Sequence, residues 1–173
     1  CIVDSNSSGI RLASGSTARI WNNTIADNSI IGLVNDNSAP DFANNIVVAN
    51  GVGVHCIGAG ITPAYNDVWG NGSDWSGACA DPSGAGGNIS EDPEFVSANN
   101  FNLIVNSPCI DRGDPARFDP DGSVADMGAF GGLHAVRTTP DRVENFWVVS
   151  VADSIHLSWD PVPGASWYVI YRS

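Results

Sequence analysis

Residues 20–28 read IWNNTIADN, residues 42–50 read FANNIVVAN, and residues 63–71 read PAYNDVWGN. The three stretches share an Asn in the fourth position, an aliphatic residue in the sixth and a second Asn in the ninth, and they begin 22 and 21 residues apart. A short sequence that returns at a fixed period in the low twenties is typical of a solenoid, in which each repeat forms one coil.

The pattern also reaches back to the start of the chain. An aliphatic column consists of Val3, Ile25, Val47 and Val68. An asparagine column follows it three positions later and consists of Asn6, Asn28, Asn50 and Asn71. A further asparagine column, in which Cys1 occupies the place of the first member, consists of Asn23, Asn45 and Asn66. Columns that keep the same spacing together indicate stacked coils.

The coils are predicted to consist of strands, because each repeat is short, rich in Asn and Gly, and broken every few residues. A leucine-rich repeat needs regularly spaced leucines, and residues 1–71 contain only Leu12 and Leu33. The pattern therefore predicts an all-β parallel β-helix with coils of about 22 residues, stacked roughly 4.8 Å apart.

In such a β-helix, equivalent residues of successive coils lie above one another. We expect the aliphatic column to face inward, with a second inward stack formed by Ile10, Leu33 and Val54, each of which follows a Gly. The Asn column that begins at Asn6 is expected at a turn, as a structural ladder of amide hydrogen bonds, because Asn tolerates a left-handed backbone.

The charge and hydropathy of the chain limit the kinds of partner that it can bind. The 173 residues suffice for one domain and part of a second, and they carry 19 acidic against 7 basic residues, all of them Arg, for a net charge of -12. Nucleic acids and anionic membrane surfaces are bound through basic patches, so both are disfavoured as partners. No apolar run approaches the roughly 20 residues of a membrane-spanning helix, so membrane insertion is not expected.

The four cysteines, Cys1, Cys56, Cys79 and Cys109, contain no CxxC pair of the kind used in zinc sites. Cys56 and Cys79 are 23 residues apart, about one coil, which would allow a disulfide. Such a disulfide would favour an extracellular, oxidising setting, and buried free thiols are the alternative.

The chain changes character from Gly87 to Gly132, a stretch that we call the closing segment (residues 87–132). It contains GNISEDPEFV at 87–96, SPCIDRG at 107–113, DPDG at 119–122 and DMGAFG at 126–131. With the repeats before it, this segment resembles the C-terminal end of secreted right-handed parallel β-helix proteins of the broad pectate-lyase-like superfamily. The resemblance covers residues 1–132 and implies the fold and secretion. It implies no activity, because lyases, hydrolases, adhesins and proteins without a known reaction share this fold.

Residues 133–140 are interpreted as a linker, and residues 141–173 resemble the first three strands of a fibronectin type III domain. Trp159 would be the core tryptophan of the second strand, and Tyr168 would lie on the third. Such a sandwich needs about 100 residues and seven strands. The remaining strands are expected either from a continuing chain or from another molecule.

No catalytic set is recognised. Lysine is absent, and the repeats offer only Arg11 and Arg19 as bases for a lyase. A glycoside hydrolase needs two carboxyl groups about 5 to 9.5 Å apart. The acidic residues at fixed places in the repeats are expected to be solvated at turns, and these are Asp4, Asp27 and Asp67.

The closing segment holds a candidate calcium site at Asp119, Asp121 and Asp126. Alternate carboxylates around a Gly-containing turn can direct their oxygens at one hard cation. The alternative is a tight turn in which Asp126 caps backbone amides.

Three tryptophans, Trp21, Trp69 and Trp75, are candidate glycan-binding residues. Alternation after the inward Val68 points Trp69 outward, and the three residues are expected near the same end of the coils. Exposed tryptophans can stack on sugar rings. The alternative is that they pack beneath the Gly- and Ser-rich loop at residues 72–87.

Two functions are compatible with these features. One is a secreted or cell-surface, non-catalytic β-helix module with a structural, adhesive or filament-forming role, which binds polysaccharide or assembles with copies of itself by strand addition. The other is a polysaccharide lyase or glycoside hydrolase whose catalytic coils precede Cys1. The first function is favoured because no catalytic set is recognised in the sequence.

Overall fold

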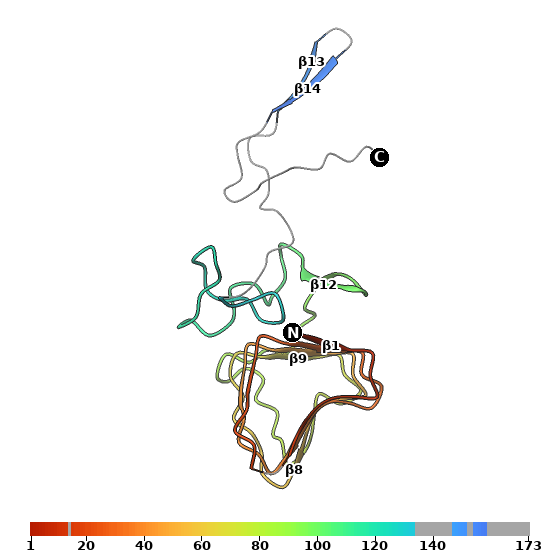
Figure 1. Cartoon of the computed structure of the whole chain (residues 1–173), viewed down its shortest axis with the longest axis vertical. Helices are drawn as coiled ribbons and strands as arrows, with labels where there is room; N and C mark the ends of the chain where they lie inside the picture. Colours follow the sequence, from red (N-terminus) through yellow and green to blue (C-terminus); the bar gives the residue numbers. More distant parts are fainter. Residues whose placement is uncertain (14, 134–146, 152–153, 159–173) are drawn as a thin grey trace. The chain divides into compact units, whose positions relative to one another are not determined.

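A computed structural model of the protein describes residues 1–13, 15–133, 147–151 and 154–158. The described secondary structure is all-β, and a parallel β-solenoid of about three turns forms its main part. The chain divides into two units, Cys1–Val136 and Arg137–Ser173. Figure 1 shows the successive coils of the first unit superimposed when viewed along the solenoid.

The first sheet, called sheet A, contains four parallel strands in the order β1-β4-β7-β9. Their bounds are Ile2–Asp4, Thr24–Ala26, Ile46–Val48 and Asp67–Trp69. The central residues of these strands are in register, Val3 with Ile25, Ile25 with Val47, and Val47 with Val68. The predicted aliphatic stack is therefore confirmed.

The second sheet, sheet B, contains parallel strands in the order β10-β8-β5-β2. From β2 to β10 their bounds are Ser8–Leu12, Ile31–Asp36, Val52–Ile57 and Trp75–Gly77. The second predicted stack is present, because Leu33 lies in register with both Ile10 and Val54. The expectation of a loop at residues 72–87 was wrong in part, because this stretch contains β10, whose Trp75 extends the stack by pairing with Val54.

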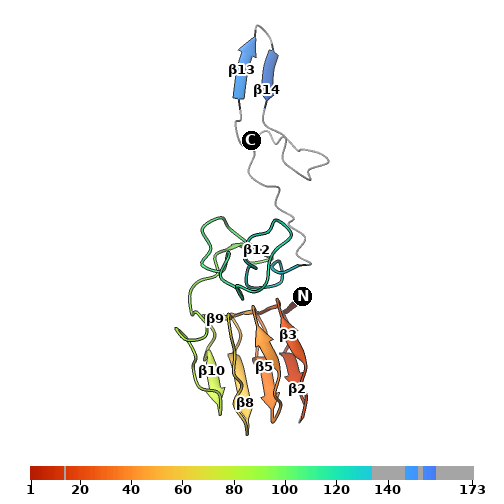
Figure 2. The same cartoon turned by 90° about the vertical axis from the view of Figure 1, so that its left-hand side faces the viewer.

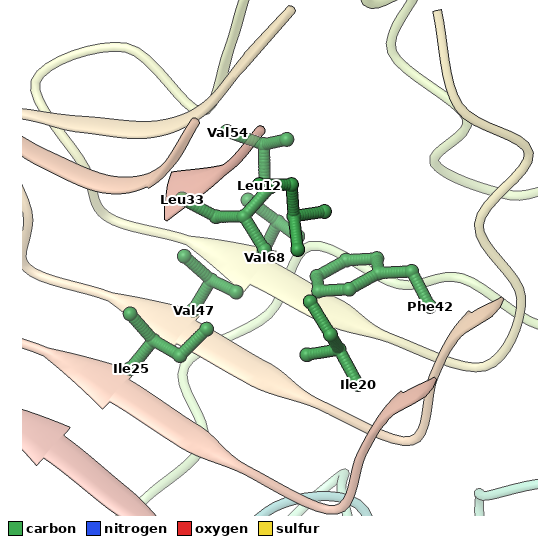
Figure 3. Packing of buried hydrophobic residues seen from close by; sticks show 8 residues of the cluster. All are labelled: Leu12, Ile20, Ile25, Leu33, Phe42, Val47, Val54 and Val68. Carbon is green, nitrogen blue, oxygen red and sulfur yellow. The ribbon is translucent and has the colours of Figure 1, made fainter. Parts of the chain in front are cut away.

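A short third sheet pairs β3, Arg19–Trp21, with β6, Asp41–Ala43. One residue from each strand, Ile20 and Phe42, points into the solenoid. Figure 3 shows side chains of all three sheets meeting in one core, formed by Leu12, Ile20, Ile25, Leu33, Phe42, Val47, Val54 and Val68. Apolar burial on this scale is the main favourable term in folding.

One asparagine ladder runs along the turn that follows sheet A. Asn28 donates from its backbone N–H and from Nδ2 to Oδ1 of Asn50, at 3.0 and 2.9 Å. Its Nδ2 also bonds the Ala26 carbonyl in its own coil and the Val3 carbonyl in the coil before. The same arrangement repeats from Asn50 to Asn71, and Asn71 donates to Asp74. Each buried amide therefore joins two coils.

A second ladder lies at the start of sheet A and links Asn23, Asn45, Asn66 and Asn88. The expectation that ladder asparagines adopt the left-handed backbone was wrong. Positive φ occurs instead at the residue before each ladder Asn, including Asp27 at 53°, Asn44 at 57° and Ala49 at 56°. The preceding residue makes the turn, so the ladder Asn can direct its amide inward.

The ladder also explains why a Gly precedes Ile10, Leu33 and Val54 on sheet B. A Cβ at Gly32 would lie 2.8 Å from the Gly53 carbonyl oxygen and 3.0 Å from the Asn50 amide. Real Cβ atoms do not approach backbone oxygen this closely, so a side chain here would displace the ladder. The Gly is required by the asparagine of the next coil.

We predict that Asn50→Ala lowers the free energy of unfolding by about 2 to 4 kcal/mol, since each buried group left without a partner costs about 1 to 3 kcal/mol. The substitution removes the acceptor of the Asn28 backbone N–H and the donor to the carbonyls of Ile25 and Val48. The control is Asn6→Ala, at an exposed member of the same ladder, with an expected loss below about 1 kcal/mol. Denaturant unfolding measures both, and equal losses would contradict the ladder's role.

A disulfide between Cys56 and Cys79 joins two successive coils of sheet B. Cys56 is buried on β8, and Cys79 packs against the solenoid core from the residues after β10. Cys1 is an exposed free cysteine and Cys109 a buried one. The disulfide therefore ties the stretch at residues 72–87 to the body of the solenoid.

Replacing both Cys56 and Cys79 by Ala should cost about 3 kcal/mol of stability, because the bond closes a loop across a separation of 23 residues. Denaturant unfolding of the oxidised proteins gives the value. Cys1→Ala is the matched control, because it removes an exposed thiol that forms no disulfide. A double variant as stable as this control would show that the bond does not constrain the unfolded chain.

In the second unit, β13, Trp147–Val151, and β14, Ser154–Ser158, form an antiparallel pair. The predicted core residue Trp159 and the predicted third-strand residue Tyr168 lie outside the described residues.

Candidate functional site: the covered face of sheet A

The outer face of sheet A is covered by the closing segment. The two side chains of β4 that point outward, Thr24 and Ala26, are both 0% exposed, and those of β7, Ile46 and Val48, are also buried. Figures 1 and 2 show the closing segment, including β12, lying across the side of the solenoid formed by β1 and β9. Over β4 and β7 the outer face is thus internal, whereas Ile2 and Asp4 of β1 stay exposed.

A second apolar cluster fills the space between the two layers. Sheet A contributes Ala26, Ile46 and Val48, and the closing segment contributes Phe101, Cys109 and Met127. Within the closing segment, β11, Phe95–Ser97, and β12, Asn100–Leu103, form an antiparallel pair whose Phe95 and Phe101 rings meet edge to face at 5.1 Å. The closing segment is therefore held by a core of its own.

Hydrogen bonds to backbone groups and neutral side chains anchor the later part of the closing segment. The coils supply acceptors and donors at Asn22, Thr24 and Asn44. The bonds are Asn22 Nδ2 to the Asp126 carbonyl at 3.0 Å, Ala129 N–H to Thr24 Oγ1 at 3.1 Å, Gly128 N–H to the Asn44 carbonyl at 2.8 Å and Asp114 N–H to Asn44 Oδ1 at 2.8 Å. None of these bonds involves a group that titrates near neutral pH.

A different contact anchors the earlier part of the segment. Asp67, an outward residue of β9, is 0% exposed, and the Cys109 thiol donates to its Oδ2 at 3.2 Å. The backbone N–H of Glu91 donates to Oδ1, also at 3.2 Å. Both partners belong to the closing segment. Asp67 is paired with no cation, because the ion pairs among the described residues are Arg11–Asp36 and Arg117–Asp114.

This environment raises the pKa of Asp67 from its ordinary 3.8 to about 7. Burial is the main cause, since it disfavours the charged form. The negative charges of Glu91 and Asp74 add to it, whereas the hydrogen bonds from Glu91 and Cys109 act in the opposite direction. Burial and the adjacent Asp67 also raise the pKa of the Cys109 thiol, which stays neutral.

The expectation of solvated turn carboxylates holds for Asp4 and Asp27, which are exposed, and was wrong for Asp67. The coil pattern predicts that Asp67 points outward from β9, but only the closing segment places it in an apolar setting. A carboxyl group with a raised pKa can serve as a catalytic acid. Asp67 has no exposed surface through which a substrate could reach it, so in this structure it belongs to the packing.

We predict that Asp67→Asn stabilises the protein at pH 8 by on the order of 3 kcal/mol and has little effect near pH 4. The folded state holds the Asp67 proton up to about pH 7, whereas the unfolded state loses it near 3.8, so Asp67 makes stability fall as pH rises between these values. Asn keeps an acceptor for Glu91 N–H and cannot ionise.

Urea unfolding of both proteins between pH 4 and 9 tests this prediction. The matched control is Asp27→Asn, which changes the same charge at an exposed turn. A difference between wild type and Asp67→Asn that stays constant over the whole pH range would contradict the assignment.

The structure does not bring the candidate glycan-binding tryptophans together. Trp21 lies on β3 in the third sheet, where the guanidinium carbons of Arg19 and Arg117 lie 4.9 and 3.4 Å from its ring centre. Trp69 points outward from β9, as predicted, but packs against the apolar cluster between sheet A and the closing segment. Trp75 packs against the solenoid core from β10. The expectation that they share one end of the coils was wrong.

The candidate calcium residues make hydrogen bonds to backbone amides. Asp119, which is buried, accepts from the backbone N–H of Asp126 and of Gly132. Asp121 accepts from Ser123 N–H and Oγ, and Asp126 accepts from Asp111 N–H. No group of three or more His, Cys, Asp or Glu side chains with a metal-binding arrangement occurs among the described residues. The turn thus has the geometry of the amide-capping alternative, and calcium stays a prediction.

Sheet B keeps an outer face that the closing segment does not cross, as Figure 2 shows. Residues in register along it are Arg11, Val34, His55 and Ser76. The His55 Nδ1 and Ser76 Oγ atoms lie 2.7 Å apart, a pair that sequence reasoning missed. The period of the coils would have placed the two residues side by side, because they are 21 positions apart.

The part of the chain that the structure describes contains no helix with the length and hydropathy needed to cross a membrane. Comparison with known proteins finds no matching protein family, no matching curated protein and no matching solved structure.

Proposed function

We propose that this chain is a secreted or cell-surface, non-catalytic β-helix module that presents a rigid face to a polysaccharide. The observation that carries the proposal is the cover over sheet A. The closing segment buries the outward side chains of β4 and β7, so the module offers its ligand the outer face of sheet B.

The outer face of sheet B has suitable groups for a hydroxyl-rich ligand. The Arg11 side chain is 61% exposed and is held by an ion pair with Asp36 at 2.8 Å. His55 and Ser76 lie two and three strands further along the same register. Guanidinium, imidazole and hydroxyl groups in one register, with the buried Val34 between Arg11 and His55, can hydrogen-bond the sugars of an extended chain. The tryptophans do not enter this account, because each packs within the protein or beneath Arg side chains.

A secreted setting is supported by the Cys56–Cys79 disulfide, since such bonds persist in oxidising compartments. Membership of the right-handed pectate-lyase-like superfamily and a fibronectin type III-like second unit belong to the same proposal. They rest on the sequence resemblance, together with the parallel solenoid and the antiparallel β13–β14 pair. Calcium at the Asp119 turn and self-assembly by strand addition are secondary parts of it.

The second candidate function is a polysaccharide lyase or glycoside hydrolase with its catalytic coils outside this chain. The described residues favour it less, because Asp67 is buried and His55 is bonded only to a hydroxyl. In that case the described coils would have a structural role, and the catalytic residues would lie on other coils of the same solenoid.

Affinity electrophoresis in gels that contain polygalacturonate, alginate or xylan tests the proposal. At least one polysaccharide should retard the protein, and Arg11→Ala should reduce the retardation several-fold, because it removes the exposed donor on sheet B. Arg112→Ala is the matched control, since it removes the same charge from an exposed position of the closing segment. The control should migrate as wild type does.

Two results would contradict the proposal. One is equal loss of retardation in both Arg variants, or no retardation in any gel. The other is turnover, measured as new reducing ends or unsaturated uronates, that disappears on His55→Ala. The latter would make the His55–Ser76 pair part of an active site.

A further inference from the structure

The closing segment is attached to sheet A at two places with different chemistry. The later part, around Asn44 and Gly128, is held by backbone and amide groups whose charge does not change with pH. The earlier part is held by Asp67, which contacts both Glu91 and Cys109 of the segment. Within the described residues, this second attachment is made by the carboxyl group of a buried residue of sheet A.

We propose that the Asp67–Cys109 contact is a proton-controlled latch, which holds the early part of the closing segment against β9 and releases it when the Asp67 carboxyl loses its proton to water. This inference is independent of the proposed polysaccharide binding. Release would uncover the outer face of β7 and β9, which carries Ile46, Val48 and Trp69.

The surroundings of Asp67 favour release once it is ionised. The groups that face it are the Glu91 carboxylate from the closing segment, the Asp74 carboxylate from the turn before β10 and the neutral Cys109 thiol. Asp126 adds a negative charge near Cys109. No ion pair of the described residues involves Asp67. An anion in this position therefore has acidic neighbours and two hydrogen bonds, and opening would return it to water.

The proton equilibrium places the transition near neutral pH, because the pKa of Asp67 in the closed structure is about 7. If the open state returns Asp67 to an ordinary carboxyl, the opening equilibrium should increase at least about tenfold between pH 5 and pH 8. The increase should level off above pH 8, when Asp67 is ionised in both states.

Cys109 reports on the latch, because its side chain is 0% exposed and can react only after opening. The experiment measures alkylation of Cys109 by iodoacetamide from pH 5 to 9, in the full chain with Cys1→Ser and with the disulfide intact. The rates are compared with those of the same chain carrying Asp67→Asn. The thiol in the open state is the same in both proteins, so the ratio of rates at each pH compares their opening equilibria.

The expected ratio of wild type to Asp67→Asn rises at least about tenfold between pH 5 and pH 8. A ratio that does not change with pH would overturn the proposal. A second measurement avoids the substitution and uses amide hydrogen exchange in the wild type. Protection of Glu91 N–H, which bonds Asp67, should fall with pH, whereas protection of Gly128 N–H, which bonds the Asn44 carbonyl, should not.

Equal decreases at both amides, relative to their intrinsic rates, would mean that the segment or the whole solenoid opens as one body. That result would also overturn a latch at Asp67. Unchanged protection at both amides would show that ionisation is tolerated in the closed state, which contradicts the proposal directly.

Discussion

The side-chain amide of a buried ladder asparagine donates to two backbone carbonyls and to the amide oxygen of the next coil, and its own oxygen accepts from the coil before. At Asn45 these bonds measure 2.8 to 3.0 Å. Buried polar groups are costly unless they are satisfied, so the two ladder asparagines of a coil keep a fixed separation of five residues, as in Asn23–Asn28, Asn45–Asn50 and Asn66–Asn71, while the whole coil varies between 22 and 21 residues. This fixed separation, the Gly before Leu33 and Val54 on sheet B and the left-handed residue before each ladder Asn all follow from this constraint.

A solenoid built in this way is uniform along its length, and the closing segment makes one of its faces different. It covers sheet A with a second apolar cluster and leaves the outer face of sheet B uncovered. It also buries a carboxyl group that the coil pattern alone would leave in water. The fold therefore separates two faces, that of sheet A, which is covered over β4 and β7 and holds the Asp67 contact, and that of sheet B, which carries Arg11, His55 and Ser76 in register. The proposed ligand binding and the proposed latch lie on these separate faces.

The coil architecture could be predicted from the sequence because the register is written as repeated spacing. The aliphatic stack at Val47 and the proximity of Cys56 and Cys79 both follow from it, and so does Asn88, which stands 22 residues after Asn66 and extends the second ladder. The position of the left-handed residue was assigned incorrectly, because Asn itself tolerates that backbone. In the structure the residue before a ladder Asn adopts it even where its side chain does not favour it, as at Tyr65 and Ala49.

The candidate site could not be predicted in the same way, because the closing segment has no period. The position of Cys109 in the sequence does not indicate that its thiol contacts Asp67, which is 42 residues earlier in the chain. The same limitation affected the tryptophans. Alternation correctly pointed Trp69 outward but could not show that it packs against an apolar cluster shared with the segment, and Trp21 is covered by Arg117 from that segment.

The most direct measurement on the central claim is hydrogen exchange of the asparagine side-chain amides, followed by NMR. The ladder account predicts that the Nδ2 protons of Asn28, Asn45 and Asn50 exchange far more slowly than those of the exposed Asn99 and Asn106, because each is bonded on both sides within the solenoid. Exchange of the ladder amides at the rate of the exposed ones would show that the side chains are open to water, and would contradict the account.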